Sequence, residues 1–224
     1  IWSRLVGSEM CIRDRVNLES PAQTRIQDVC QGFAIEDITY SFAGGAVDVI
    51  WNGLPSGLVI EKVYDLIDPD KISRLDITGT PNIAVLTDTT FDYTIKALNS
   101  NGCNQQEQTG SITVKANAEL SLLSTSLSQN QTVCVGEDIL PINIGYENSL
   151  PPSVSGMPAG LYTDNATPGV LKIRGQVDDL QLGNPNRTIT VVGTNTNGCQ
   201  SQEIIININV CLLYTSPSPR DETK

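Results

Sequence analysis

Apolar and polar side chains alternate one by one in several short segments of the chain. In residues 91–97, FDYTIKA, every second position is apolar, and the same alternation recurs in residues 204–210, IIININV. A period of two is typical of a β-strand with one buried face. Asn101-Gly102 and Asn197-Gly198 stand between such segments, and Asn-Gly favours a tight hairpin turn. We find no capped helical stretch, so the pattern predicts an all-β chain.

The same landmarks occur twice, in the same order. The first half contains VCQGFAIEDITY, NGLPSGL, LDITGTP, FDYTIKALNSNGC and SITVKA, and the second contains VCVGEDILPINIGY, SGMPAGL, LKIRGQV, RTITVVGTNTNGC and EIIININV. The chain therefore reads as two tandem copies, residues 16–117 and 118–210, each near the commonest domain size. Short strands separated by turn signals in units of that size predict two Greek-key β-sandwiches.

The two ends of the chain encode each other. Residues 5–15, LVGSEMCIRDR, can be back-translated into DNA whose reverse complement, read one base in, encodes CLLYTSPSPR, residues 211–220. Such an inverted repeat resembles a sequencing-library adapter translated through both ends of an insert. We therefore interpret residues 1–15 and 211–224 as adapter-derived scars, which are left out of fold reasoning. The expectation is that the chain is a fragment of a larger protein.

Charge and composition disfavour several classes of function. The chain carries 14 Lys and Arg against 25 Asp and Glu, a net charge of −11, which disfavours nucleic acid because phosphate binding depends on clustered cations. No run approaches the roughly 18 apolar residues of a membrane span. The chain has no histidine, so the usual triads and zinc sites are excluded. The sequence predicts no enzyme activity, no cofactor and no metal site.

The motif pairs GLPSGL with ITGTP and GMPAGL with IRGQV resemble the Ig-like and cadherin-like repeats found in tandem in large bacterial surface and secreted proteins. The VCxG opening and the NGC near the end of each copy are similar to a cysteine-bearing, PKD-like subtype. The resemblance implies two tandem Ig-like β-sandwich domains in an extracellular or cell-surface protein. It also implies a structural spacer, with neighbouring repeats of the same polypeptide as partners. The alternative is an adhesin module that recognises a surface glycan, a protein or Ca²⁺ through loops at the end of a sandwich.

Four cysteines outside the predicted scars recur at matching positions, one early and one late in each copy. Cys30 precedes Cys134 by 104 residues, and Cys103 precedes Cys199 by 96. Metal binding would favour close pairs such as CxxC, which are absent. The simplest pairing is one disulfide within each copy, Cys30 with Cys103 and Cys134 with Cys199. The alternative is buried free thiols in a reducing cytosol.

Three further features have both a functional and a structural interpretation. Asp65, Asp68 and Asp70 within DLIDPD offer carboxylates to Ca²⁺, but a solvated acidic loop fits their spacing better. Trp51 can stack on a sugar ring, but we expect it to pack in a core. The copies differ most between residues 59–74 of the first and residues 162–172 of the second. A loop that binds a ligand is therefore to be sought there.

Overall fold

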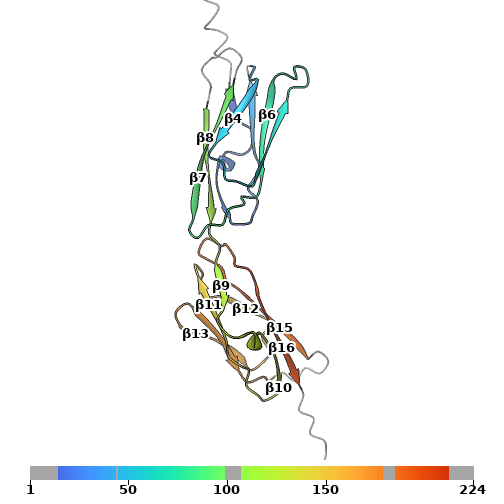
Figure 1. Ribbon diagram of the computed structural model, residues 1–224, viewed down its shortest axis with the longest axis vertical. Helices are drawn as coiled ribbons and strands as arrows, with labels where there is room; N and C mark the ends of the chain where they lie inside the picture. The colour runs from blue at the N-terminus through green and yellow to red at the C-terminus, as the bar shows by residue number, and fades with distance from the viewer. Residues whose placement is uncertain (1–14, 44, 99–106, 179–184, 212–224) are drawn as a thin grey trace, which may run out of the picture. The chain divides into compact units, whose positions relative to one another are not determined.

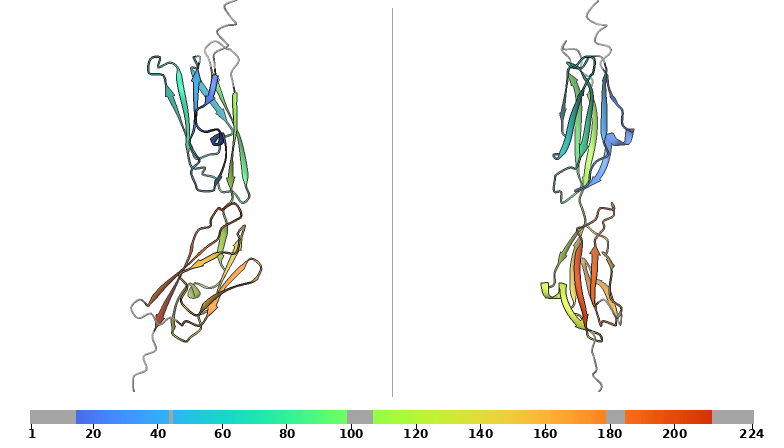
Figure 2. Two further views of the ribbon diagram at one scale, coloured as in Figure 1. Left: turned by 180° about the vertical axis from the view of Figure 1, so that it is seen from behind. Right: turned by 90° about the vertical axis from the view of Figure 1, so that its right-hand side faces the viewer.

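The computed structural model describes residues 15–43, 45–98, 107–178 and 185–211, and the remaining residues are not discussed. The chain divides into two compact units, Ile1–Ala116 and Asn117–Lys224 (Figure 1). Each consists almost entirely of strands, arranged in the two layers of a sandwich (Figure 2). The predicted fold class, two tandem Ig-like Greek-key β-sandwiches, is confirmed.

The first unit contains two four-stranded sheets. One has the order β1-β3-β6-β5 and the other the order β2-β8-β7-β4. The bounds are β1 Arg15–Leu18, β2 Ile26–Cys30, β3 Ile38–Ala43, β4 Asp48–Asn52, β5 Leu58–Tyr64, β6 Ile72–Gly79, β7 Thr89–Leu98 and β8 Glu107–Lys115, with a 3-10 turn η1 at Ala22–Arg25.

The second unit repeats this topology strand for strand. Its sheets have the orders β9-β11-β14-β13 and β10-β16-β15-β12. The bounds are β9 Glu119–Leu122, β10 Asn130–Cys134, β11 Ile142–Glu147, β12 Ser153–Ser155, β13 Leu161–Thr167, β14 Val170–Gly175, β15 Asn186–Val192 and β16 Ile204–Cys211, with a one-turn helix α1 at Ser126–Gln129. The structure thus gives the two predicted copies one architecture.

The named strands pair antiparallel except at one place in each unit. There β2 lies parallel to β8 over five residue pairs, and β10 lies parallel to β16 over five pairs. Strands β1 and β16 also extend one residue beyond the predicted insert, because Arg15 and Cys211 both occupy strand positions.

Each unit encloses its own apolar core, and the predicted alternation explains its composition. In β7, Tyr93, Ile95 and Ala97 are buried, while in β16 the buried residues are Ile206, Ile208 and Val210. Phe91 and Ile204, at the outer ends of the same alternations, are partly buried against the two cores. The alternate apolar side chains of the period-two segments therefore face the core, as the sequence predicts.

The repeated glycines of GLPSGL and GMPAGL mark the crossing from one sheet to the other. Gly53 follows β4 with a φ of 82°, and Gly156 follows β12 with a φ of 76°. A Cβ at Gly53 would lie 2.0 Å from the carbonyl oxygen of Asp92, and one at Gly156 would lie 2.2 Å from that of Thr188. Only glycine fits both the backbone conformation and the contact, which explains why the motif occurs in both copies.

The two cores are filled differently at one cross-strand pair. In the first unit Tyr93 lies opposite Gly110, and a Cβ on this glycine would lie 2.4 Å from the Tyr93 hydroxyl oxygen. In the second unit the corresponding pair is Ile189 and Ile206. A large and a small residue in one copy thus replace two medium ones in the other, which conserves volume.

The hydroxyls of Tyr40 and Tyr93 share a hydrogen bond of 3.1 Å inside the first core. Burial raises the pKa of both phenols above the ordinary value. In the unfolded chain a tyrosine loses its proton near pH 10. The unfolded state therefore binds fewer protons than the folded state above that pH, and stability falls as the pH rises.

We expect the first unit to lose about 1 kcal/mol of unfolding free energy between pH 10 and pH 11, because Tyr93 stays protonated only in the folded state. The raised pKa of Tyr40 adds to the loss in the same direction. Urea unfolding followed by the fluorescence of Trp51 measures this loss. The double variant Tyr40→Phe, Tyr93→Phe is the control and should show a much weaker pH dependence. An equal slope in the control would contradict the assignment.

Candidate binding surface

The β5–β6 hairpin of the first unit is the part that the second copy does not reproduce. Residues 65–71 join β5 to β6, whereas residues 168 and 169 alone join β13 to β14. In Figure 1 the first hairpin ends in the loop beyond the strand labelled β6. We call residues 65–71, DLIDPDK, the hairpin tip.

The hairpin tip is a defined turn. The N–H groups of Ile67 and Asp68 donate to Asp65 Oδ1 at 2.8 and 3.1 Å, and these donors lower the pKa of Asp65. The Asp65 N–H donates to the carbonyl of Lys71 at 2.8 Å. Lys71 Nζ lies 2.6 Å from Asp68 Oδ2, and this contact raises the pKa of Lys71. Local hydrogen bonds and one ion pair therefore fix the loop.

The carboxylates of the hairpin tip are a poor start for a calcium site. Asp65 already accepts two backbone N–H groups, and Asp68 is paired with Lys71, so Ca²⁺ would have to replace existing partners. No group of three or more His, Cys, Asp or Glu side chains among the described residues is arranged to hold a metal ion. The arrangement agrees with a solvated acidic loop.

The tip carries an apolar feature that sequence reasoning missed. Leu66 is 101% exposed and Ile67 is 95% exposed, relative to an extended residue. Two adjacent aliphatic side chains at full exposure are unusual in a turn of acidic residues, because burial would remove their apolar surface from water. The signal in the sequence is the apolar pair between Asp65 and Asp68. The sequence analysis considered only the carboxylates of DLIDPD and did not consider this pair.

The prediction that Trp51 packs in a core is wrong. Trp51 lies on the edge strand β4 opposite the buried Ile95, yet its side chain remains 38% exposed. Within the described part of the chain β4 is the outermost strand of its sheet. The ring contacts Lys62, whose ammonium lies 5.3 Å from the ring centroid. Lys62 also pairs with Asp48 at 2.5 Å and lowers the pKa of that carboxyl group.

These three side chains line a shallow, solvent-open groove at the edge of the sandwich together with Val49 and Ile50. The groove places an indole face beside one cation and one anion. Such a surface can stack against an apolar face of a ligand and bond its polar groups. The cation–π contact already occupies one face of the indole, however, and among the described residues Trp51 is the one aromatic residue that lines the groove.

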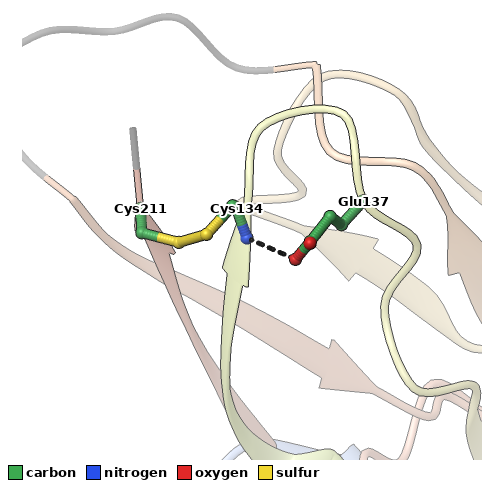
Figure 3. Close-up of a disulfide and its surroundings, with 3 residues drawn as sticks. All are labelled: Cys134, Glu137 and Cys211. Carbon is green, nitrogen blue, oxygen red and sulfur yellow. Dashed lines mark hydrogen bonds between the residues drawn. A yellow bond between two sulfur atoms is a disulfide. The ribbon is translucent and has the colours of Figure 1, made fainter. Parts of the chain in front are cut away.

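The predicted pairing of Cys134 with Cys199 is wrong. Cys134 forms a disulfide with Cys211, with a Cα–Cα distance of 4.3 Å (Figure 3). The reason is register, because parallel pairing of β10 with β16 sets these two residues side by side. Cys199 lies before β16 begins, at its opposite end. Cys211 was assigned to an adapter-derived scar, yet in this chain it is part of a strand.

Cys30 and Cys199 are also disulfide-bonded. Cys103 lies outside the described residues, so the pairing of Cys30 with Cys103 stays a prediction. No helix in the described part of the chain is both long and apolar enough to cross a membrane.

No protein-family model matches the chain, and comparison with curated proteins found no match. Among solved structures the chain is similar to one of titin, with 12% identity, coverage of 89% of this chain and 100% of that chain, and a TM-score of 0.37. It is similar to fibronectin(III)-like modules of CbhA from Clostridium thermocellum, with 14% identity, coverage of 91% and 98%, and a TM-score of 0.29. It is also similar to the sialic-acid-binding region of a Streptococcus sanguinis adhesin, with 11% identity, coverage of 92% of this chain and 80% of that chain, and a TM-score of 0.32. These likenesses carry no argument about ligand or activity.

Proposed function

We propose that the chain is a pair of non-catalytic spacer repeats from a larger secreted or cell-surface bacterial protein, flanked by adapter-derived residues 1–15 and 211–224. The repeats occupy residues 16–117 and 118–210. Each would hold its neighbours in the polypeptide apart while remaining folded.

The observation that carries this proposal is the parallel pairing of an early strand with the last strand in each unit. Strand β2 pairs with β8, and β10 pairs with β16, each over five residues. Force applied along the chain pulls the two strands of such a pair in opposite directions along their common axis. All the inter-strand hydrogen bonds are then loaded together, whereas strands pulled apart from one end lose them one at a time. This geometry suits a module that carries tension.

The chemistry of the chain agrees with a non-catalytic, extracellular part. Disulfides persist in oxidising compartments and are rare in the cytosol, and Cys30, Cys134, Cys199 and Cys211 are all bonded. The chain has no histidine and a net charge of −11. A strongly acidic surface keeps a protein soluble and disfavours nucleic acid and anionic membranes as partners.

The hairpin tip supports a second candidate function, that of an adhesin module. A fixed turn that presents two exposed aliphatic side chains is suited to insertion into an apolar pocket of another protein, because burial there would remove their apolar surface from water. Of the two copies, the first has this hairpin tip and the second does not. A binding function would therefore reside in the first copy, while the second would remain a spacer.

A binding comparison separates the two candidates. The whole chain on beads is tested against a panel of surface glycans and extracellular-matrix proteins, beside the variant Leu66→Ser, Ile67→Ser. The matched control is Leu86→Ser, Leu127→Ser, which removes exposed aliphatic side chains elsewhere. The spacer proposal predicts retention at bead background for all three chains. Retention that is lost only in the Leu66→Ser, Ile67→Ser variant would establish the adhesin instead.

A further inference from the structure

The side of the second sandwich carries a group of exposed aliphatic side chains around the one-turn helix α1. Leu127 lies in α1 and is 71% exposed, while Leu123, Leu140 and Ile205 are each about half exposed. In the right-hand view of Figure 2, α1 projects from the side of the second unit in yellow-green. We call the four residues the aliphatic patch.

Hydrogen bonds bring the segments of the aliphatic patch together at α1. The side-chain amide of Gln131 donates to a carbonyl oxygen of α1 at 2.8 Å and to the carbonyl oxygen of Leu140 at 3.2 Å. The side-chain amide of Gln129, the last residue of α1, donates to the carbonyl oxygen of Ile205 at 2.8 Å. Two residues separate Leu123 from the start of α1. The four side chains therefore belong to one region of the surface.

Hydrogen bonds that recur in both copies identify the equivalent positions of the first copy. In each copy a glutamine side chain bonds the N–H and the carbonyl of one residue, at 2.8 and 3.1 Å for Glu36 and at 2.8 and 3.2 Å for Leu140. The N–H of Glu19 donates to a carbonyl of β3 at 2.8 Å, as that of Leu123 donates to a carbonyl of β11 at 2.9 Å. At these two positions leucine in the second copy replaces glutamate in the first.

The other two positions follow from the same alignment. Leu127 is the second residue of α1, and Gln23 is the second residue of η1. Ile205 and Thr109 each lie two residues before the residue that pairs with the first residue of the parallel strand. All four aliphatic residues thus replace exposed polar residues of the first copy. Single exposed aliphatic residues are common, but four in one region of a surface indicate a contact.

The segments that carry the aliphatic patch contain no charged residue. Residues 120–136, 139–146 and 204–210 include no Asp, Glu, Lys or Arg. The equivalent segments of the first copy, 16–32, 35–42 and 108–114, include Glu19, Arg25, Asp28, Glu36 and Asp37. Apolar side chains in a setting depleted of charge are typical of the centre of a protein–protein interface.

The net charge of the chain indicates which partner fits. Two copies of a chain with a net charge of −11 repel each other over much of their surfaces. The uncharged segments are where two copies can touch without placing carboxylates opposite each other. They also lack the carboxylates that a basic partner would pair with and the cations that an anionic membrane would require. A second copy presents aliphatic side chains to aliphatic side chains, and a two-fold axis matches the patch with itself.

We propose that the second unit forms a symmetric dimer with the second unit of another copy of this chain, through the aliphatic patch. Leu127 on the projecting α1 lies at the centre of the contact. The neighbouring exposed side chains of β10 and β16 form an uncharged polar rim, Asn130, Thr132, Asn207 and Asn209. Asn207 Nδ2 donates to Asn130 Oδ1 at 2.9 Å, so part of this rim is already ordered in the single chain. The dimer does not depend on the spacer function proposed above.

Sedimentation equilibrium of the whole chain, from micromolar to submillimolar concentrations, tests the proposal. The parent chain should pass from monomer to dimer across this range. Added NaCl should strengthen the dimer, because salt screens the repulsion between two acidic chains. The variant Leu123→Glu, Leu127→Gln, Leu140→Glu, Ile205→Thr introduces the first copy's residue at each position. It should raise the dissociation constant by about 100-fold or more, because each copy loses four aliphatic contacts.

The variant should keep the fold, because the first copy carries the same residues at the equivalent positions. Its second unit should therefore melt close to that of the parent. Should it melt early, the single variant Leu127→Gln decides, with an expected rise in the dissociation constant of about tenfold. The matched control Leu66→Ser, Ile67→Ser removes exposed aliphatic side chains from the hairpin tip and should dimerise like the parent.

Three results would overturn the proposal. The first is a parent chain that stays monomeric at every concentration, including one that floats with vesicles of neutral phosphatidylcholine, since flotation would assign the patch to a lipid surface. The second is a dimer that survives both the four-residue variant and Leu127→Gln unchanged. The third is a dimer that weakens as NaCl is added, because ion pairs and not the uncharged patch would then hold it together.

Discussion

Replacing Cys211 by serine should lower the melting temperature of the second unit by about 8–32 °C. The disulfide closes a segment with a sequence separation of 77 residues. Cross-links of this kind stabilise a domain by about 2–4 kcal/mol, largely by restricting the unfolded chain, and each kcal/mol moves the melting temperature of a domain near 100 residues by about 4–8 °C. Calorimetry of the whole chain measures the change, with Trp51 fluorescence identifying the transition of the first unit.

The double variant Cys134→Ser, Cys211→Ser is the matched control. It should melt within a few degrees of Cys211→Ser, because either change removes the same bond. Reducing the parent chain should lower its second transition at least as far as the variants do, because reduction also breaks the disulfide of Cys199. A Cys211→Ser chain that melts like the parent would show that the last residue of β16 contributes nothing to the fold.

Replacing Gly156 by alanine should destabilise the second unit by about 3 kcal/mol. The left-handed backbone at this position costs an alanine about 1–2 kcal/mol, and its Cβ would lie 2.2 Å from the Thr188 carbonyl oxygen. Relieving such an overlap displaces the backbone that follows β12 from the neighbouring strand β15, at a further cost of about 1–3 kcal/mol. Denaturant unfolding of the second unit gives the difference directly.

Gly136→Ala separates the two contributions. Gly136 has a φ of 87°, and no atom lies within 4 Å of the position its Cβ would take. This control should lose only the backbone contribution, about 1–2 kcal/mol. Equal losses in the two variants would mean that the close approach to Thr188 has no energetic role in the repeated motif.

The sequence predicted those features that depend on local pattern. Alternation placed Tyr93, Ile95 and Ile206 in the cores, and the copies aligned because each needs glycine at positions such as Gly53 and Gly156, where the chain crosses between sheets. These constraints act over a few residues, so they can be read along the chain.

Features that depend on long-range register could not be read in the same way. The partner of Cys134 follows from the parallel pairing of β10 with β16 across 77 residues, and counting cysteines per copy pointed to Cys199 instead. Trp51 lies in a predicted strand, but that strand is at the edge of its sheet. The apolar and polar pattern of a strand does not show whether the strand is central or at an edge. Leu66 and Ile67 are exposed because the hairpin extends beyond the core.

Pulling the whole chain by its ends, with every disulfide reduced, tests the spacer function most directly. Each unit should unfold in a separate event that releases about 30 nm, since roughly 100 residues extend by about 3.4 Å each. Both events should require a distinct force peak without any added ligand or ion, because the β2–β8 and β10–β16 pairs are sheared. Extension without a force peak, or peaks that appear only when a ligand is supplied, would contradict the spacer function.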